Sequence, residues 1–159
     1  MKHTLKYLVL AAFIAFVAAP MQAQVATKST VTLELAKKIA AKANAEAVKN
    51  KWTMVITILD DGGNLVYLEK MDGTQLGSID VAQAKARTAL RFKRPTKVFE
   101  DGVAGGRNAL LALPGVVPIE GGIPLIVGDA VIGSIGVSGA TSAQDGQVAA
   151  AGATALTQP

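Results

Sequence analysis

Apolar residues between positions 32 and 50 recur at steps of three and four, the spacing of one face of an α-helix. The recurring positions are Leu33, Ala36, Ala40, Ala43 and Ala47. Thr32 stands directly before them, and threonine is among the residue types that cap helix N-termini. The pattern therefore predicts a helix over 32–50, with Thr32 as its N-cap.

The next segment has strand character on both sides of a turn cluster. Residues 52–59 are β-branched and apolar, and the same character resumes over 65–69. Between them stands Asp60-Asp61-Gly62-Gly63-Asn64, a composition typical of turns. We therefore expect a β-hairpin over 52–69.

Two further helical segments follow the hairpin. A helix over 78–94 is predicted to begin with Ser78 as its cap and to stop at Pro95. Thr96 is the predicted cap of a short helix, and another helical turn is expected around 108–113.

The C-terminal part combines strands with one last helix. Residues 116–138 are apolar, β-branched and interrupted by glycines, which predicts strands joined by a tight turn at 128–130. Ser142-Ala143-Gln144-Asp145 has the pattern of a capping box and opens a helix that reaches about residue 156. The order helix, hairpin, helix, strands, helix predicts an α+β domain with an antiparallel sheet.

The first residues form a separate unit. A basic start precedes an apolar run of 13 residues over 7–19, and small residues follow up to Ala23. This run is shorter than the ~20 residues that a membrane-spanning helix needs. The segment therefore predicts a secretory signal peptide over 1–23 and one domain over 24–159, periplasmic or secreted.

Composition narrows the chemistry of the exported chain. The sequence has no cysteine, and cleavage after Ala23 removes His3, its single histidine. Catalytic triads with histidine, cysteine nucleophiles, zincin-type sites and haem ligation by histidine are therefore excluded. Cleavage leaves 14 basic residues against 12 acidic ones, a formal charge of +2. This balance argues against a dedicated nucleic-acid-binding protein.

A row of arginines is the strongest candidate for anion binding. Arg87, Arg91 and Arg94 are spaced by four and three, so they share one face of the predicted 78–94 helix. Such a row is commonly a solvated surface. The functional alternative is a clamp for carboxylates or phosphates, because the guanidinium fork binds both in bidentate fashion.

Other side chains offer weaker signals. The carboxylates in glycine-rich surroundings, which are candidate proton carriers, are Asp72, Glu120 and Asp145. The thioether and phenol groups that this chain offers a metal are Met54, Met71 and Tyr67. The sequence alone does not bring any of these groups together.

Several segments together resemble one known family. They are Met71-Asp72-Gly73, Ala84-Lys85-Ala86-Arg87-Thr88-Ala89 running to Phe92 and Pro95-Thr96, Gly121-Gly122-Ile123-Pro124-Leu125, Gly133-Ser134-Ile135-Gly136-Val137-Ser138-Gly139, and Gln144-Asp145. In this order they resemble the GlcG/HbpS-like family, also called the haem-degrading or DUF336 domain, and are similar to the C-terminal domain of PduO-type proteins. The resemblance covers essentially the whole exported chain.

The resemblance implies a profilin-like fold with a five-stranded antiparallel sheet between helices. It also implies assembly into homo-oligomers, for which the glycine- and alanine-rich helix 142–156 offers small side chains suited to close packing. Exported members resemble haem-binding proteins that act outside the cell, in some cases with a sensor protein as partner or in protection against oxidative stress.

For individual residues the resemblance implies less. Family haem binding involves a threonine hydroxyl in one branch, for which Thr88 and Thr96 are the candidates, and a histidine in another, which is absent here. Gly121 and Gly122 would lie at the pocket. Glu120 stands where the family often has proline, and its charge would disfavour haem propionates unless an arginine neutralised it.

Three hypotheses follow. The first is an exported protein that binds haem or a similar tetrapyrrole in a flat apolar pocket. Its propionates would contact Arg87, Arg91 or Arg94, and its iron would meet a weak ligand such as Thr96, Met71 or Tyr67. The second is an enzyme for a small acid or other metabolite, and the third is an oligomeric module that binds a partner protein and no cofactor.

Overall fold

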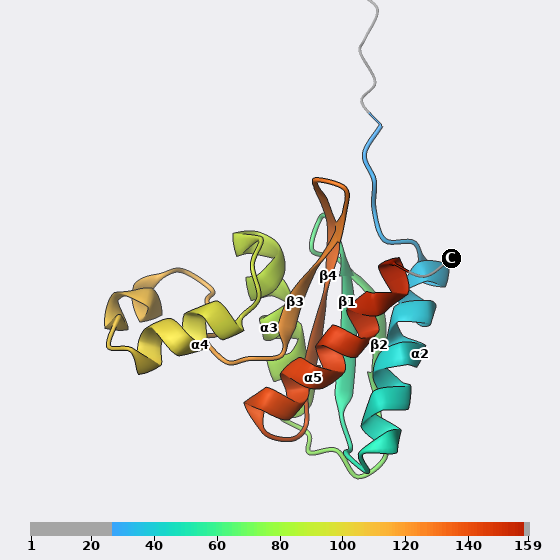
Figure 1. Cartoon of the computed structure of the whole chain (residues 1–159), viewed down its shortest axis with the longest axis horizontal. Helices are drawn as coiled ribbons and strands as arrows, with labels where there is room; N and C mark the ends of the chain where they lie inside the picture. The colour runs from blue at the N-terminus through green and yellow to red at the C-terminus, as the bar shows by residue number, and fades with distance from the viewer. Residues whose placement is uncertain (1–26, 158–159) are drawn as a thin grey trace, which may run out of the picture.

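Three helices cover the two faces of a four-stranded antiparallel sheet in the computed structural model, which describes residues 27–157 (Figure 1). The elements are α2 (Leu33–Lys49), β1 (Val55–Asp60), β2 (Leu65–Lys70), α3 (Ser78–Phe92), α4 (Lys97–Ala104), η1 (Asn108–Ala112), β3 (Gly122–Val127), β4 (Ala130–Ser138), α5 (Ser142–Ala153) and η2 (Thr154–Leu156). The α+β class and the predicted order of elements are confirmed. The predicted signal peptide over 1–23 lies outside the described residues.

The sheet has the order β2-β1-β4-β3 and consists of two hairpins placed side by side. In the first hairpin, the Asp60 carboxylate accepts hydrogen bonds from the backbone N–H groups of Gly62 (2.9 Å) and Asn64 (2.8 Å). These bonds explain why the acidic cluster forms a turn. The two hairpins join where β1 pairs with β4, with Thr57 opposite Gly136.

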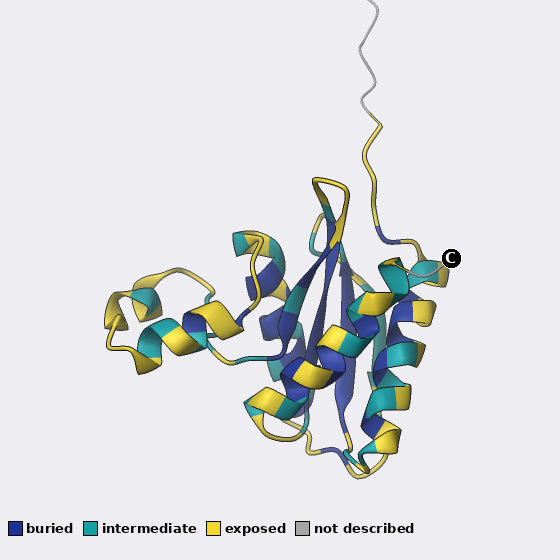
Figure 2. Cartoon of the chain, in the orientation of Figure 1, coloured by how far each residue is buried: buried dark blue, intermediate teal, exposed yellow. Residues whose placement is uncertain are grey.

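Helix α3 packs on one face of the sheet, while α2 and α5 lie side by side on the other face (Figure 1). The buried side chains concentrate on the sheet and on the inner faces of these helices (Figure 2). A Cβ atom at Gly136 of β4 would lie 2.0 Å from the carbonyl oxygen of Ala82 on α3. Glycine at this position therefore lets the helix backbone approach the strand closely.

Helix α4 and η1 form an arm that extends away from the sheet (Figure 1). Most of the arm is exposed or only partly buried (Figure 2). Among its apolar side chains, Val98 is 48% exposed and Leu111 is 58% exposed. Phe99 is its buried anchor.

The sheet has four strands where the resemblance implied five, and the profilin-like assignment stays a prediction. Residues 116–121, which the sequence suggested were strand, form an irregular segment before β3. Their backbone groups bond to side chains of the helical layer, since Val117 N–H donates to the Thr88 hydroxyl (3.0 Å) and Glu120 N–H donates to Glu100. Because side chains satisfy these two donors, this part of the segment does not need a strand partner. The segment meets the sheet at its end, where Val137 N–H of β4 donates to the Gly121 carbonyl at 2.9 Å.

Three predicted caps differ from the structure. Thr96 stands at the N-cap position of α4, but its side chain makes no capping hydrogen bond. The other two errors concern serine. Gly77 is the residue before α3, while the Ser78 hydroxyl lies inside the protein. The last helix begins one residue earlier than its predicted box, because Thr141 and Gln144 form the reciprocal capping box. Asp145 therefore lies one position after the box, and its carboxylate makes a different contact. Thr32, in contrast, caps α2 as predicted, accepting from Leu35 N–H at 3.2 Å.

Within residues 27–157, no helix combines the length and apolar character needed to cross a membrane.

Candidate functional site

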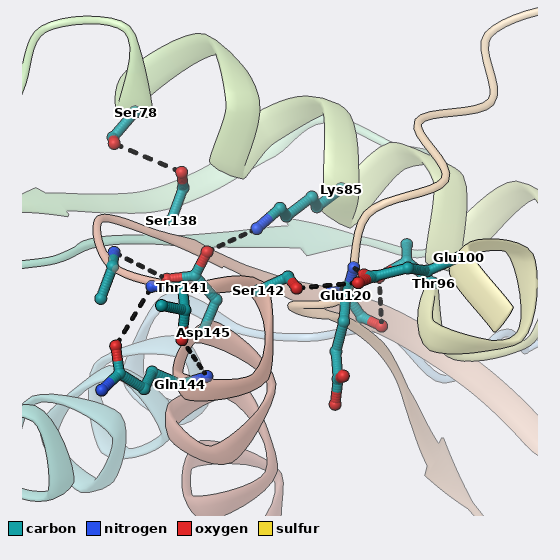
Figure 3. Close-up of polar contacts among 12 residues, drawn as sticks. Ser78, Lys85, Thr96, Glu100, Glu120, Ser138, Thr141, Ser142, Gln144 and Asp145 are labelled. Carbon is teal, nitrogen blue, oxygen red and sulfur yellow. Dashed lines mark hydrogen bonds and ion pairs between the residues drawn. The ribbon is translucent and has the colours of Figure 1, made fainter. Parts of the chain in front are cut away.

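A buried ion pair joins the helices on opposite faces of the sheet. Lys85 of α3 donates from Nζ to Oδ2 of Asp145 on α5 at 2.6 Å, and the two side chains are 1% and 3% exposed (Figure 3). The other oxygen, Oδ1, accepts from the backbone N–H of Ala140 at 3.1 Å. Burial raises the pKa of Asp145, and the bond from Lys85 opposes that rise.

Gly121 and Gly122 pack directly against this pair. Gly121 has φ +128°, and a Cβ atom there would lie 2.9 Å from Lys85 Nζ and 2.6 Å from the carbonyl oxygen of Val137. A Cβ atom at Gly122 would lie 2.3 Å from the carbonyl oxygen of Lys85. The double glycine therefore allows the chain to cross over the ion pair at backbone distance.

Both candidate threonines are fully buried and hold the 115–122 segment in place. The Thr96 hydroxyl accepts from Gly122 N–H at 2.9 Å, and Thr96 N–H donates to the Gly122 carbonyl at 2.9 Å (Figure 3). The Thr88 hydroxyl donates to the Ala84 carbonyl at 2.9 Å. Their hydroxyl groups are therefore engaged in the fold.

Glu100 connects the same segment to the last helix. One of its carboxylate oxygens accepts from the Glu120 N–H, and the other accepts from the Ser142 hydroxyl at 2.8 Å (Figure 3). The Glu120 side chain lies over Gly146, where a Cβ atom would be 2.3 Å from its Oε1. Lys97 Nζ is 3.9 Å from the Glu120 carboxylate, so a lysine partly neutralises this acid.

The thioether and phenol candidates lie on the hairpin. Tyr67 OH donates to Glu69 Oε2 at 3.2 Å, and burial together with the Glu69 charge raises the pKa of Tyr67. Met71 Sδ accepts from the N–H of Met54 at 3.4 Å, and Met54 is fully buried. Met54, which directly precedes β1, belongs to the hydrophobic core, and Tyr67 and Met71 pack against that core.

The three arginines are exposed and do not converge on one site. Arg87 donates to Gln83 at 3.2 Å along the helix. Arg91 lines one surface cleft, and Arg94, which lies beyond the end of α3, lines another.

The first of these, which we call the hairpin cleft, lies between the ends of the two hairpins and α3. It has a volume of about 440 Å³ and is lined by Lys28, Asp61, Gly62, Leu90, Arg91, Lys93, Asp129, Ala130 and Val131. Lys28 is paired with Asp61. Mixed charges and few apolar side chains make this cleft suited to small polar solutes.

The second, which we call the α4 groove, lies between the end of α3 and the arm. It has a volume of about 310 Å³ and is lined by Phe92, Arg94, Val98, Phe99, Arg107, Leu110 and Leu113. The rings of Phe92 and Phe99 meet edge to face at 5.3 Å, and the Arg94 guanidinium lies 5.9 Å from the Phe99 ring centre. Five apolar side chains and two arginines, with no carboxylate in the lining, suit an apolar ligand that carries negative charge.

The candidate proton carriers do not form a catalytic cluster. Asp72 is exposed, Glu120 is half-buried, and Asp145 is occupied by Lys85. Among residues 27–157, no group of three or more His, Cys, Asp or Glu side chains could hold a metal ion.

Sequence reasoning missed Arg107 and the role of Lys85. Arg107 stands in a glycine-rich segment far along the chain from the arginine row, so no periodicity connects them. Lys85 lies two positions before Arg87, and no role was predicted for it beside the arginine row. The available signal that it faces inward was the pair of apolar residues Ala82, three positions before it, and Ala89, four positions after it.

The geometry thus defines an α+β domain with an arginine-flanked apolar groove. The model of the family described as "Haem degrading protein HbpS-like" matches residues 31–154, and the chain belongs to this family. The resemblance that the sequence motifs indicated is confirmed.

Individual relatives agree with this assignment. Protein GlcG of Escherichia coli K12 is 42% identical over 112 residues, which are 70% of this chain and 84% of that protein. A crystal structure of a double mutant of Streptomyces reticuli HbpS superposes with a TM-score of 0.76 at 33% identity, covering 87% of this chain and 97% of that one. A crystal structure of PduOC in complex with haem has a TM-score of 0.71 at 26% identity, covering 79% and 94%.

Proposed function

We propose that this chain is an exported protein that binds haem or a similar tetrapyrrole, and that the α4 groove is its binding site. The observation that carries the proposal is the lining of this groove, which is apolar and aromatic apart from Arg94 and Arg107. Haem presents the matching chemistry, a flat apolar macrocycle with two carboxylates at one edge. The haem complex among the structural neighbours supports the same ligand class.

The lining chemistry favours this assignment over the hairpin cleft, because the α4 groove has two aromatic rings and no carboxylate, whereas Asp61 and Asp129 line the hairpin cleft. Burying apolar surface contributes about 25 cal/mol per Å², so the aromatic and leucine side chains would supply most of the affinity. The arginines would add charge-assisted hydrogen bonds to the propionates. Haem is larger than the groove, so the groove would take the propionate edge and leave the opposite edge outside it.

The proposal extends to the setting of the protein. The predicted signal peptide supports export to the periplasm or beyond, where a haem-binding protein would serve haem handling, protection against oxidative stress or sensing. The exposed apolar side chains of the arm support a homo-oligomer. A sensor protein as partner stays a prediction from the resemblance.

The test is a titration of purified residues 24–159 with haemin. We expect a saturable shift of the Soret band at about one haem per chain. A spectrum identical to that of free haemin with an inert protein would contradict the proposal. That result would favour the alternative of a partner-binding module.

A further inference from the structure

The threonine hydroxyl groups that were candidates for holding the iron already make hydrogen bonds within the fold. Thr96 is fully buried, and its hydroxyl accepts from Gly122 N–H at 2.9 Å. Thr88 is also fully buried, and its hydroxyl both donates to Ala84 and accepts from Val117 N–H at 3.0 Å. A bond from either hydroxyl to a metal would require the 115–122 segment to open.

The hairpin candidates lie at the other side of the sheet. Tyr67 belongs to β2, which is one edge strand, whereas the groove is lined by residues of α3, α4 and η1 and of the segments next to them. Helix α4 lies on the side of β3, the opposite edge strand (Figure 1). Met71 follows β2 directly. Neither side chain lines the groove.

The groove itself offers no electron-pair donor for a metal. Its lining consists of aromatic, aliphatic and arginine side chains, and a guanidinium stays protonated with no lone pair to give. Lys97 of α4 is bonded to Asp101 Oδ1 at 2.8 Å. This bond raises the pKa of Lys97, so the lysine is held in its protonated form.

What the groove does offer is unpaired positive charge beside apolar surface. Arg94 is held by a bond from Nε to the Phe92 carbonyl at 3.2 Å and by the Phe99 ring. Its terminal nitrogens remain available. Within residues 27–157, neither Arg94 nor Arg107 is within ion-pair distance of a carboxylate.

We infer that the α4 groove recognises the carboxylates and the flat apolar face of its ligand, with no bond from the protein to the metal. This inference rests on the proposed function. The ligands of the α4 groove are then planar apolar dicarboxylates, with or without iron. Metal-free porphyrins therefore belong to this class together with haem. Arg94 and Arg107 are the carboxylate-binding residues.

The first experiment compares three ligands on the same protein. Binding of haemin, protoporphyrin IX and its dimethyl ester is followed by quenching of Trp52, the single tryptophan, which requires no iron. We expect haemin and protoporphyrin IX to bind within about threefold of each other. The dimethyl ester should bind at least ~10-fold more weakly, because it lacks the charges that the arginines contact.

The second experiment removes the arginines one at a time. Arg94→Ala and Arg107→Ala should each weaken both haemin and protoporphyrin IX about 10-fold, with the loss shrinking at high salt. Arg87→Ala is the matched control, because it removes the same charge from an exposed site that bonds only to Gln83. Thermal unfolding of each variant checks that the fold is retained. Arg107 is exposed, so Arg107→Ala carries the test if Arg94→Ala fails to fold.

The outcomes separate this inference from the proposed function. If the unaltered protein does not bind haemin, the proposed function fails. If it binds haemin but not protoporphyrin IX, or if both arginine variants bind normally, the proposed function stands and the inference is overturned. Loss of binding in Arg91→Ala alone would also overturn it, because it would place the ligand in the hairpin cleft.

Discussion

The Lys85 side chain has a different environment from the cationic side chains near it in the sequence. It is followed in the sequence by the cations Arg87, Arg91, Lys93 and Arg94. Its side chain is nevertheless only 1% exposed, and its ammonium group bonds to Asp145. Removing one member of a buried ion pair leaves the other charge without compensation, which costs more than the pair itself contributes.

We therefore predict that Lys85→Met lowers the free energy of unfolding by about 3–5 kcal/mol. The expected cause is the unpaired carboxylate of Asp145, so the double variant Lys85→Met/Asp145→Leu should recover much of the loss. Urea denaturation followed by circular dichroism measures both. Lys38→Met, at the exposed Glu34 pair, is the control and should change stability by less than about 1 kcal/mol. Equal stabilities of the single and double variants would contradict the account.

Tyr67 allows a prediction about pH. Its pKa is raised by burial and by the Glu69 charge, so the folded protein keeps the phenol protonated to higher pH than the unfolded chain does. The unfolded chain therefore loses this proton first, and stability falls as pH rises above about 10. After removal of residues 1–23, Tyr67 is the single tyrosine, so absorbance near 295 nm reports it alone. We expect Glu69→Gln to lower its midpoint. A midpoint below 10 in the unaltered chain would be inconsistent with this environment.

At the scale of elements, the contact between α3 and β4 depends on glycine. A methyl group at Gly136 would meet the backbone of α3 at Ala82 and Ala86, where nothing can rotate away. Gly77, at the start of the same helix, has no atom within 4 Å of the corresponding position and an ordinary helical φ of −60°.

We predict opposite outcomes for two alanine substitutions. Gly136→Ala should destabilise the protein by about 3 kcal/mol, because the helix must shift away from the sheet. Gly77→Ala should leave stability unchanged or raise it by up to about 1 kcal/mol, since it restricts the unfolded chain. Thermal unfolding of the pair is the measurement. Similar losses in both variants would refute the role given to the close approach.

At the scale of the whole molecule, the arm is the surface whose exposed apolar side chains suit contact with another protein chain. Of the small residues of α5, which the sequence predicts to serve subunit contacts, Gly146, Ala149 and Gly152 pack inside the chain, while Ala143 and Ala150 are exposed. A Cβ atom at Gly152 would lie 2.7 Å from Ile135 Cδ1 and 3.1 Å from Ala43 Cβ. The arm exposes Leu111, and Leu113, which directly follows the arm, is exposed as well.

We predict that the protein is a stable homo-oligomer and that its interface includes the arm. Light scattering at micromolar concentration should give a mass above that of one chain. Leu111→Glu should lower this mass, because a charge in an apolar interface is costly to desolvate. Leu33→Glu, at another exposed leucine, on α2, is the control. A monomer mass for the unaltered protein would contradict the prediction.

The sequence by itself determined the elements, their order and the family. Helix and strand periods, turn residues and prolines act over a few positions, so the α2 cap at Thr32 and the hairpin turn at Asp60 could be predicted locally. The family motifs also marked the glycines at which two backbone segments approach each other closely. They did not reveal the physical reason why glycine is needed there.

The tertiary structure alone decided which polar side chains are buried and which line a groove. Lys85 meets Asp145 across 60 positions of sequence, and Arg94 is joined at the groove by Arg107 from another element. Thr88 and Thr96 are buried where the chain passes before and into β3, because the backbone N–H groups of Val117 and Gly122 donate to their hydroxyl groups. Such contacts depend on how helices pack on the sheet, and no local period encodes that packing.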